Sequence, residues 1–181
     1  MLDLDELVMG CRGAVAAGEG PLAVKGLLER AMASGDQLAA IASQAPAGLN
    51  IVYRGAESTV VNAVWPPNVS LAPHDHRMWA VIAVYSGEED NAFYRREGAS
   101  ITPSGGRRLR PRDVLVLGRD AVHAVSNPRH AYCGAIHVYG GDFLGIARSQ
   151  WNAALEEQPF DFEEVRAEIR RAELQFAMRQ A

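Results

Sequence analysis

Ala-Pro-His-Asp-His-Arg-Met-Trp-Ala-Val-Ile-Ala-Val-Tyr-Ser-Gly, residues 72–87, is the stretch from which the fold of this chain can be argued. Successive residues of a β-strand point to opposite faces, so His74 and His76 project together while Asp75 faces away. The Val- and Ile-rich run that follows is typical of a buried strand, and Gly87 closes it. The stretch therefore predicts two strands with a pair of imidazoles on one face.

His123 supplies a third imidazole. It lies in Ala-Val-His-Ala-Val-Ser-Asn, residues 121–127, which has the composition of another short strand. Three imidazoles on neighbouring strands can fill one side of a metal's coordination sphere and leave the other side open for a substrate and oxygen. The sequence thus predicts a metal site made of His74, His76 and His123. Zn, Cu, Ni and Fe all accept imidazole ligands, so the residues alone do not select the metal.

The pattern along the rest of the chain favours a β-core between helices. Short segments rich in Val, Ile, Tyr and Trp alternate with turn residues over 49–140, which is typical of a sandwich or small barrel. Helical spacing of apolar residues characterises 1–47, with a short third helix expected at 36–43, and returns at 161–178. We therefore expect a single, mainly β domain over 1–181, flanked by helices at both ends.

Charge indicates which partners to expect. The formal net charge of −4 argues against nucleic acid or an anionic membrane as the main partner. One basic cluster, Arg107 to Arg112, follows Ser-Gly-Gly at 104–106. A solvated turn between strands is the preferred interpretation of this cluster, and phosphate binding is the alternative. We expect a small molecule as the partner.

The cysteines and the first residues bear on the compartment. Cys11 and Cys133 lie far apart, so they build neither a disulfide framework nor a CxxC zinc site. The first six residues, Met-Leu-Asp-Leu-Asp-Glu, are acidic where a signal peptide is basic. A reducing, cytoplasmic setting is the resulting expectation, and it suits ferrous iron.

Two motifs, in order, resemble those of the cupin superfamily. The first has His-x-His and a closing glycine, as in 74–87; the second has a turn and then His-x-x-x-Asn, as in 111–113 and 123–127. The resemblance implies a double-stranded β-helix, also called a jelly-roll barrel, with a metal bound inside it. Many cupins add a glutamate ligand four or five residues after the second histidine, where this chain has Ala80 and Val81.

The missing glutamate has an electrostatic consequence. Three neutral imidazoles leave the full dipositive charge on the metal. Such a charge favours capture of an anionic chelating substrate and lowers the pKa of a bound thiol.

Among cupins, an all-histidine site of this spacing resembles the cysteine dioxygenase and 3-mercaptopropionate dioxygenase family. Residues 76–87 are similar to its ligand strand, 136–140 to its His-x-Tyr strand, and 145–148 to the segment that carries a carboxylate-binding arginine in the bacterial mercaptopropionate branch. The resemblance covers roughly 50–150. It implies a three-histidine Fe(II) dioxygenase that uses O2 to oxidise a small thiol carboxylate to its sulfinate.

The same resemblance assigns roles to further residues. Tyr139 and His137 would form an outer-sphere relay beside the iron, and Arg148 or Arg54 would anchor the substrate carboxylate. The alternative is that Tyr139 and His137 are core residues and that the arginines are surface residues. One departure concerns the relay, because Ala135 stands where the family has a serine.

Ala135 keeps two other functions open. An all-histidine cupin can cleave a non-thiol substrate such as a β-diketone, or the chain can be a non-catalytic cupin that binds a metal or a small ligand. The sequence leaves the oligomeric state open, a homodimer included.

Overall fold

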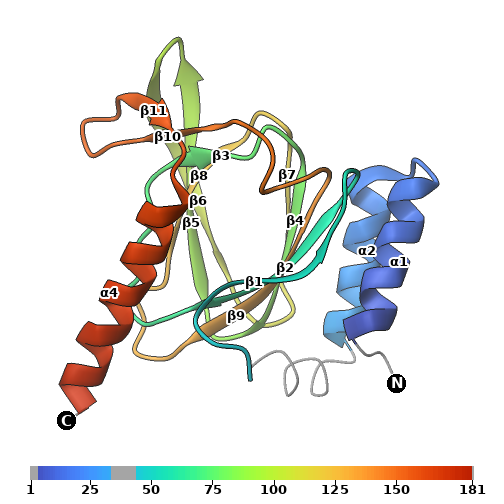
Figure 1. Cartoon of the computed structure of the whole chain (residues 1–181), viewed down its shortest axis with the longest axis horizontal. Helices are drawn as coiled ribbons and strands as arrows, with labels where there is room; N and C mark the ends of the chain where they lie inside the picture. The colour runs from blue at the N-terminus through green and yellow to red at the C-terminus, as the bar shows by residue number, and fades with distance from the viewer. Residues whose placement is uncertain (1–3, 34–43, 181) are drawn as a thin grey trace.

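Two antiparallel sheets form the body of the computed structural model, which describes residues 4–33 and 44–180 (Figure 1). The five-stranded sheet has the order β1 (Gly48–Arg54), β2 (Thr59–Trp65), β9 (Cys133–Tyr139), β4 (Ala80–Ser86), β7 (Val114–Leu117). The six-stranded sheet has the order β11 (Glu157–Pro159), β10 (Ser149–Trp151), β3 (His74–Asp75), β8 (Val122–Ser126), β5 (Glu89–Glu97), β6 (Ser100–Leu109). The expectation of a mainly β jelly roll with flanking helices is confirmed.

Both faces of the five-stranded sheet are buried. In β2, Val61 and Ala63 belong to the core between the two sheets. Their neighbour Val60 belongs to a second core on the outer face, as do Val81 and Ile136. This alternation is the period of two expected of a strand, here with apolar residues on both sides.

Helices cover both sides of the sheet pair (Figure 1). On one side, α1 (Leu4–Ala16) and α2 (Gly20–Ala33) bury their apolar faces against the outer face of the five-stranded sheet. On the opposite side, α4 (Phe162–Gln180) buries Val165, Ile169 and Ala172 in the core between the sheets. The Asp161 carboxylate caps α4 by accepting a 2.7 Å hydrogen bond from the Glu163 amide.

The expected turn is confirmed for only part of the basic cluster: residues 110–112 lie in an exposed turn between β6 and β7, whereas Arg107 and Arg108 lie in a strand. Residues 100–109 form β6, which pairs with β5 along its whole length. Pro103 opposes Tyr94 next to a register shift, and β6 is the edge of its sheet. An exposed edge strand tolerates proline, glycine and arginine because one side of it makes no ladder hydrogen bonds. The composition of a loop and that of an edge strand are therefore alike.

Gly87 has a conformation that excludes other residues. It joins β4 to β5 with φ of 68°, in the left-handed region. A Cβ added there would lie 2.4 Å from the carbonyl oxygen of Tyr132 and 2.8 Å from the Cα of Cys133. The glycine that closes the first motif thus lets two backbone segments approach each other at the end of the barrel.

Two further findings concern the sequence predictions. The short strands β10 and β11 lie beyond the segment in which strands were expected, and the third N-terminal helix, expected at 36–43, lies outside the described residues. None of the described helices combines the length and apolar character needed to cross a membrane.

Candidate metal centre

The three histidines converge inside the barrel. β3 pairs with β8 so that His74 stands directly opposite His123, and His76 follows at the end of β3. One ligand nitrogen from each ring lies within 4.8 Å of the others, and all three side chains are buried. The Nε2 atoms of His76 and His123 are 3.3 Å apart. Two nitrogens bound to one metal at about 2.1 Å lie about 3.0 to 3.4 Å from each other, so the spacing fits a shared ion.

Hydrogen bonds on the far side of two rings direct Nε2 toward the cluster. Nδ1 of His74 lies 3.0 Å from the carbonyl oxygen of Ala72, and Nδ1 of His123 lies 2.8 Å from Oδ1 of Asn91. An oxygen of this kind only accepts, so each Nδ1 carries the proton and each Nε2 keeps its lone pair. These are the tautomers that a metal bound through Nε2 requires.

Burial keeps the imidazoles neutral. It lowers the pKa of His74 to about 4, with the positive charge of Arg148 acting in the same direction against a hydrogen bond to Ala72. Burial also holds the pKa values of His76 and His123 well below the ordinary value, helped by the neighbouring histidines. The donor set is therefore neutral near pH 7, which is the form that binds a metal.

A buried carboxylate stands behind the histidines, and the sequence reasoning missed it. Glu89 is fully buried; its Oε1 accepts a 2.8 Å hydrogen bond from Nδ2 of Asn91, and its Oε2 accepts a 2.7 Å hydrogen bond from Nε1 of Trp65. Burial alone would raise the pKa of Glu89, but His137, Asn91 and Trp65 together hold that pKa below its ordinary value. Glu89 is thus a carboxylate inside the barrel, although not at the position where many cupins carry a glutamate ligand.

Tyr139 and His137 face the interior from β9, on the sheet opposite the ligand strands. The hydroxyl of Tyr139 lies 3.0 Å from Nδ1 of His137, and the centroid of its ring lies 5.0 Å from that of His76. Nε2 of His137 lies 3.5 Å from Oε2 of Glu89. Burial raises the pKa of Tyr139 despite the opposing charge of Arg148, so its hydroxyl keeps its proton. The structure brings both relay candidates to the histidine cluster.

Arg148 is buried between aromatic rings. Its guanidinium carbon lies 4.1 Å from the ring centroid of Phe143 and 3.9 Å from that of Phe160. Phe143 stacks on Tyr139 and Phe160 packs on His74, so one ring separates Arg148 from the cluster on each side. Burial lowers the pKa of Arg148 to about 10, which still leaves the side chain charged at neutral pH.

Arg148 also has unused donors. Nη1 donates a 2.8 Å hydrogen bond to the carbonyl oxygen of Phe143. Nε and Nη2 are buried and have no hydrogen-bond partner among the described residues. These two nitrogens form one edge of the guanidinium plane, the edge that binds the two oxygens of a carboxylate side by side.

The other arginine candidate lies elsewhere. Arg54 is half exposed and forms a two-pronged ion pair with Asp142, in which Nε and Nη2 lie 2.8 and 2.9 Å from the two carboxylate oxygens. The edge that is free in Arg148 is therefore occupied in Arg54. The structure does not bring Arg54 to the cluster with the other candidates.

Asp75, between the two ligands of β3, faces away from the cluster as the strand pattern predicts. Its Oδ2 lies 2.7 Å from Nε of Arg77 and 2.9 Å from an Nη of Arg96, and its Oδ1 accepts a 2.9 Å hydrogen bond from the Ser149 amide. The carboxylate itself is buried. It thereby ties the ligand strand to β5 and β10.

We expect Asp75→Asn to lower the free energy of unfolding by about 2 kcal/mol. Breaking a fully buried ion pair costs about 3 to 5 kcal/mol, and the partly exposed Arg77 and Arg96 reduce that figure. Urea denaturation of the metal-free protein measures it. Asp90→Asn is the matched control, because its partners Arg108 and Arg129 are at the surface and the expected loss is below about 1 kcal/mol. If Asp75→Asn and Asp90→Asn lower the free energy of unfolding equally, the buried ion pairs of Asp75 do not stabilise the fold more than surface pairs do.

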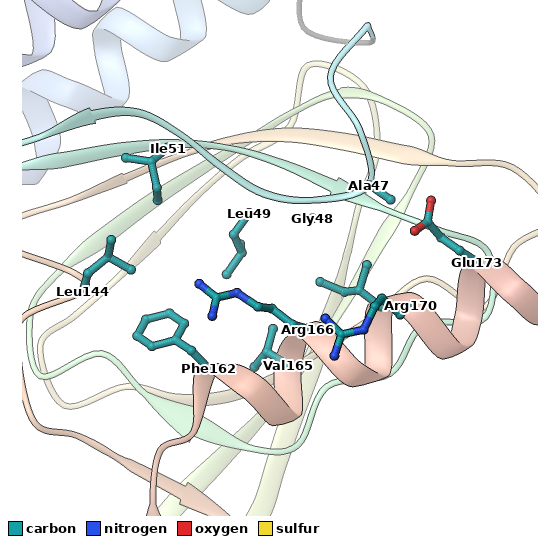
Figure 2. A pocket seen from close by; sticks show the side chains of 11 residues that line it. Ala47, Gly48, Leu49, Ile51, Leu144, Phe162, Val165, Arg166, Arg170 and Glu173 are labelled. Carbon is teal, nitrogen blue, oxygen red and sulfur yellow. The ribbon is translucent and has the colours of Figure 1, made fainter.

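Two of the cavities that border α4 bear on the position of the site. One, of about 180 Å³, is lined by His74 together with Phe160 and Glu164, and so reaches the cluster from outside. The other is a mainly apolar groove between β1 and α4, lined by residues such as Leu49 and Phe162 (Figure 2). No histidine lines this groove, so it is not the candidate site.

Several solved structures are similar to this chain in architecture. The chain matches no family model. A solved Bacillus halodurans protein is similar at 11% identity over 56% of this chain and 76% of that chain, with a TM-score of 0.51. An RmlC-like cupin of Methanocaldococcus jannaschii with a double-stranded β-helix fold matches at 9% identity over 55% and 84%, with a TM-score of 0.45. The strand order of the two antiparallel sheets is that of a jelly roll, and similar solved structures include proteins described as cupins.

An enzyme is also among the solved structures that are similar to this chain. An oxalate oxidase in complex with the substrate analogue glycolate matches at 13% identity over 52% of this chain and 51% of that chain, with a TM-score of 0.44. At such identities the likeness concerns the fold alone. The function has to be argued from the site.

Proposed function

We propose that this cupin is a metal-dependent dioxygenase that oxidises a small thiol carboxylate to its sulfinate, with Fe(II) as its metal. The observation that supports it most is the free edge of Arg148, a buried pair of nitrogen donors one aromatic ring away from three neutral imidazoles. A buried, charged guanidinium with unused donors is costly unless a ligand completes it. A carboxylate on the substrate is the group that fits this edge.

The charges around the cluster favour a dianion. Glu89 and Arg148 are both buried and carry opposite charges, so together they add no net charge to the barrel interior. The dipositive charge of a metal on three neutral histidines then has no counter-charge from its ligands. A thiolate carboxylate carries two negative charges and would neutralise the site. 3-Mercaptopropionate has this form, whereas cysteine has the same two anionic groups and an additional ammonium group.

The residues of the chain have separate tasks in this proposal. When bound, Fe(II) would supply adjacent open positions for the thiolate sulfur and for O2, and would conduct electrons between them. Arg148 holds the substrate carboxylate and so fixes the direction of the thiol. The Tyr139 hydroxyl, positioned by its hydrogen bond with Nδ1 of His137, stands beside the site as a proton relay. The buried barrel interior limits access of water. Both atoms of O2 enter the sulfinate, so no further reductant is consumed.

We expect Tyr139→Phe to keep the metal and to lower kcat about 10- to 100-fold. The change removes the hydroxyl that stands next to the reacting groups and links them to His137, and the loss of one such polar group costs about 100-fold at the lower end of the range known for transition-state hydrogen bonds. Steady-state oxygen consumption of iron-loaded protein measures it. An unchanged kcat would make Tyr139 a packing residue that stacks on Phe143.

Oxygen uptake with a panel of substrates tests the proposed function. Iron-loaded protein should consume O2 with 3-mercaptopropionate or cysteine and release the sulfinate, identified by mass spectrometry. Cysteamine, a thiol without a carboxylate, should react far more slowly because it leaves Arg148 unpaired. Uptake with acetylacetone alone would show a diketone-cleaving enzyme, the alternative that Ala135 favours. If nothing is consumed while one iron per chain is bound, the chain is a binding protein and the proposal is wrong.

A further inference from the structure

Glu89 is a buried carboxylate that is linked to both halves of the candidate site. Through Asn91 it reaches the metal ligand His123, and directly it faces His137, the partner of Tyr139. Glu89 belongs to β5, which pairs with the ligand strand β8, and its Oε2 faces His137 on β9. We propose that Glu89 is a positioning residue that decides which nitrogen of His123 and of His137 carries the proton.

The order of hydrogen-bond donors and acceptors from Glu89 through Asn91 determines which nitrogen of His123 carries the proton. An ionised carboxylate only accepts hydrogen bonds, so Asn91 must present its Nδ2 to Glu89. The amide oxygen of Asn91 then has to face His123, at 2.8 Å from its Nδ1. Nδ1 of His123 must donate, which leaves the Nε2 lone pair directed at the cluster. The Glu89 carboxylate thus fixes the metal-binding tautomer of His123 through one intervening side chain, that of Asn91.

The same carboxylate acts on the tautomer of His137. Its Nε2 lies 3.5 Å from Oε2 of Glu89 without forming a hydrogen bond among the described residues, and the negative charge of the carboxylate favours a proton on the nitrogen that faces it. Nδ1 of His137, 3.0 Å from the Tyr139 hydroxyl, is then able to accept from that hydroxyl. This role corresponds to the hydroxyl that is missing at Ala135, which is a buried residue of the same strand face. A carboxylate from another strand replaces it here.

Glutamine at position 89 cannot reproduce this arrangement. It has one acceptor and one amide donor, whereas the two oxygens of Glu89 accept from Trp65 and Asn91 and also face Nε2 of His137. If its nitrogen faces Asn91, the Asn91 amide has to turn, and the proton of His123 moves to Nε2. If its nitrogen faces Trp65 and His137, the proton of His137 moves to Nδ1. Either orientation reverses one histidine.

The test is the tautomeric state of the histidines in metal-free protein, by long-range ¹⁵N–¹H NMR with ¹⁵N-labelled histidine. Wild type should show His123 protonated on Nδ1 and His137 protonated on Nε2. Glu89→Gln should reverse one of the two, and Glu89→Asp, which keeps the carboxylate, should reverse neither. Tyr85→Phe is the matched control, because it removes a buried 2.9 Å hydrogen bond to Asn62 without touching a histidine.

Zn²⁺ titration measures the consequence for the metal site. If Glu89→Gln reverses His123, the Kd for Zn²⁺ should rise about 10- to 100-fold, the usual effect of losing a group that orients a ligand. Tyr85→Phe should stay within about twofold of wild type, as expected for a residue outside this network. If the tautomer of His123 reverses and the Kd for Zn²⁺ does not change, the tautomer of His123 does not control metal affinity.

Two results would overturn the proposal itself. One is a wild-type spectrum with the proton of His123 on Nε2, a reading that does not require any variant to fold. The other is a folded Glu89→Gln protein in which both histidines keep the wild-type tautomers. The inference rests on the metal site of the proposed function but not on its substrate. Oxygen uptake therefore tests the function separately, and either can fail without the other.

Discussion

His123→Ala should lower the metal content of the purified protein from one ion per chain to less than about a tenth. Removing one of three imidazoles takes away a third of the donor set, so the expected loss of affinity exceeds the roughly 10- to 100-fold effect of losing only an orienting partner. Metal analysis after dialysis measures it, and circular dichroism shows whether the variant is folded.

The matched control for this variant is His130→Ala. His130 is exposed in the loop between β8 and β9, so its removal should leave the metal content unchanged. A folded His123→Ala protein that still binds one equivalent would remove His123 from the ligand set. It would also leave the hydrogen bond that His123 donates to Asn91 without a role at the metal.

Arg148→Gln should lower kcat/KM for 3-mercaptopropionate about 100- to 1000-fold while one metal per chain is retained. The change removes a charge-assisted, two-pronged contact in a buried place, which is worth about 3 to 4 kcal/mol. The effect should appear mainly in KM, because Arg148 binds a part of the substrate that does not react. Oxygen-uptake kinetics over a range of thiol concentrations separate KM from kcat.

Arg54→Gln is the control that compares the two arginines. Arg54 pairs with Asp142 at the surface, so kcat/KM should stay within about twofold of wild type. The reverse result, a large loss with Arg54→Gln and a small one with Arg148→Gln, would move the carboxylate site from Arg148 to Arg54. The activity of Arg148→Gln toward cysteamine should equal that of wild type, since that thiol has no carboxylate to lose.

The sequence predicts the part of the site that depends on strand periodicity. His74 and His76 share a face because they are two residues apart, and His137 and Tyr139 share a face for the same reason. The pairing of His74 with His123 required only that their strands be neighbours. Periodicity and two short motifs were thus sufficient for the barrel and for the group of histidines.

The sequence does not predict the parts that depend on contacts between distant strands. Glu89 follows Glu88 and precedes Asp90, and nothing in this acidic run distinguishes the buried carboxylate from its two more exposed neighbours. Its burial depends on donors from Trp65 and Asn91, which the fold brings together. The register of β5 contains the available signal, because residues 89 and 91 share a face.

The two arginines show the same limit of sequence patterns. Arg148 and Arg54 both lie near strand ends, and spacing does not tell which one turns inward. The choice depends on the aromatic residues around Arg148 and on the carboxylate of Asp142 beside Arg54. Similarly, β6 has the composition of a loop because its exposed edge position places few demands on its residues.

Metal analysis of protein purified without added chelator, combined with X-ray absorption at the edge of the bound metal, tests the central claim most directly. The account predicts one ion per chain, coordinated by three imidazole nitrogens and no protein carboxylate or sulfur. A folded protein that holds no stoichiometric metal even after loading with Fe(II), or a bound ion with carboxylate or sulfur ligands from the chain, would contradict it.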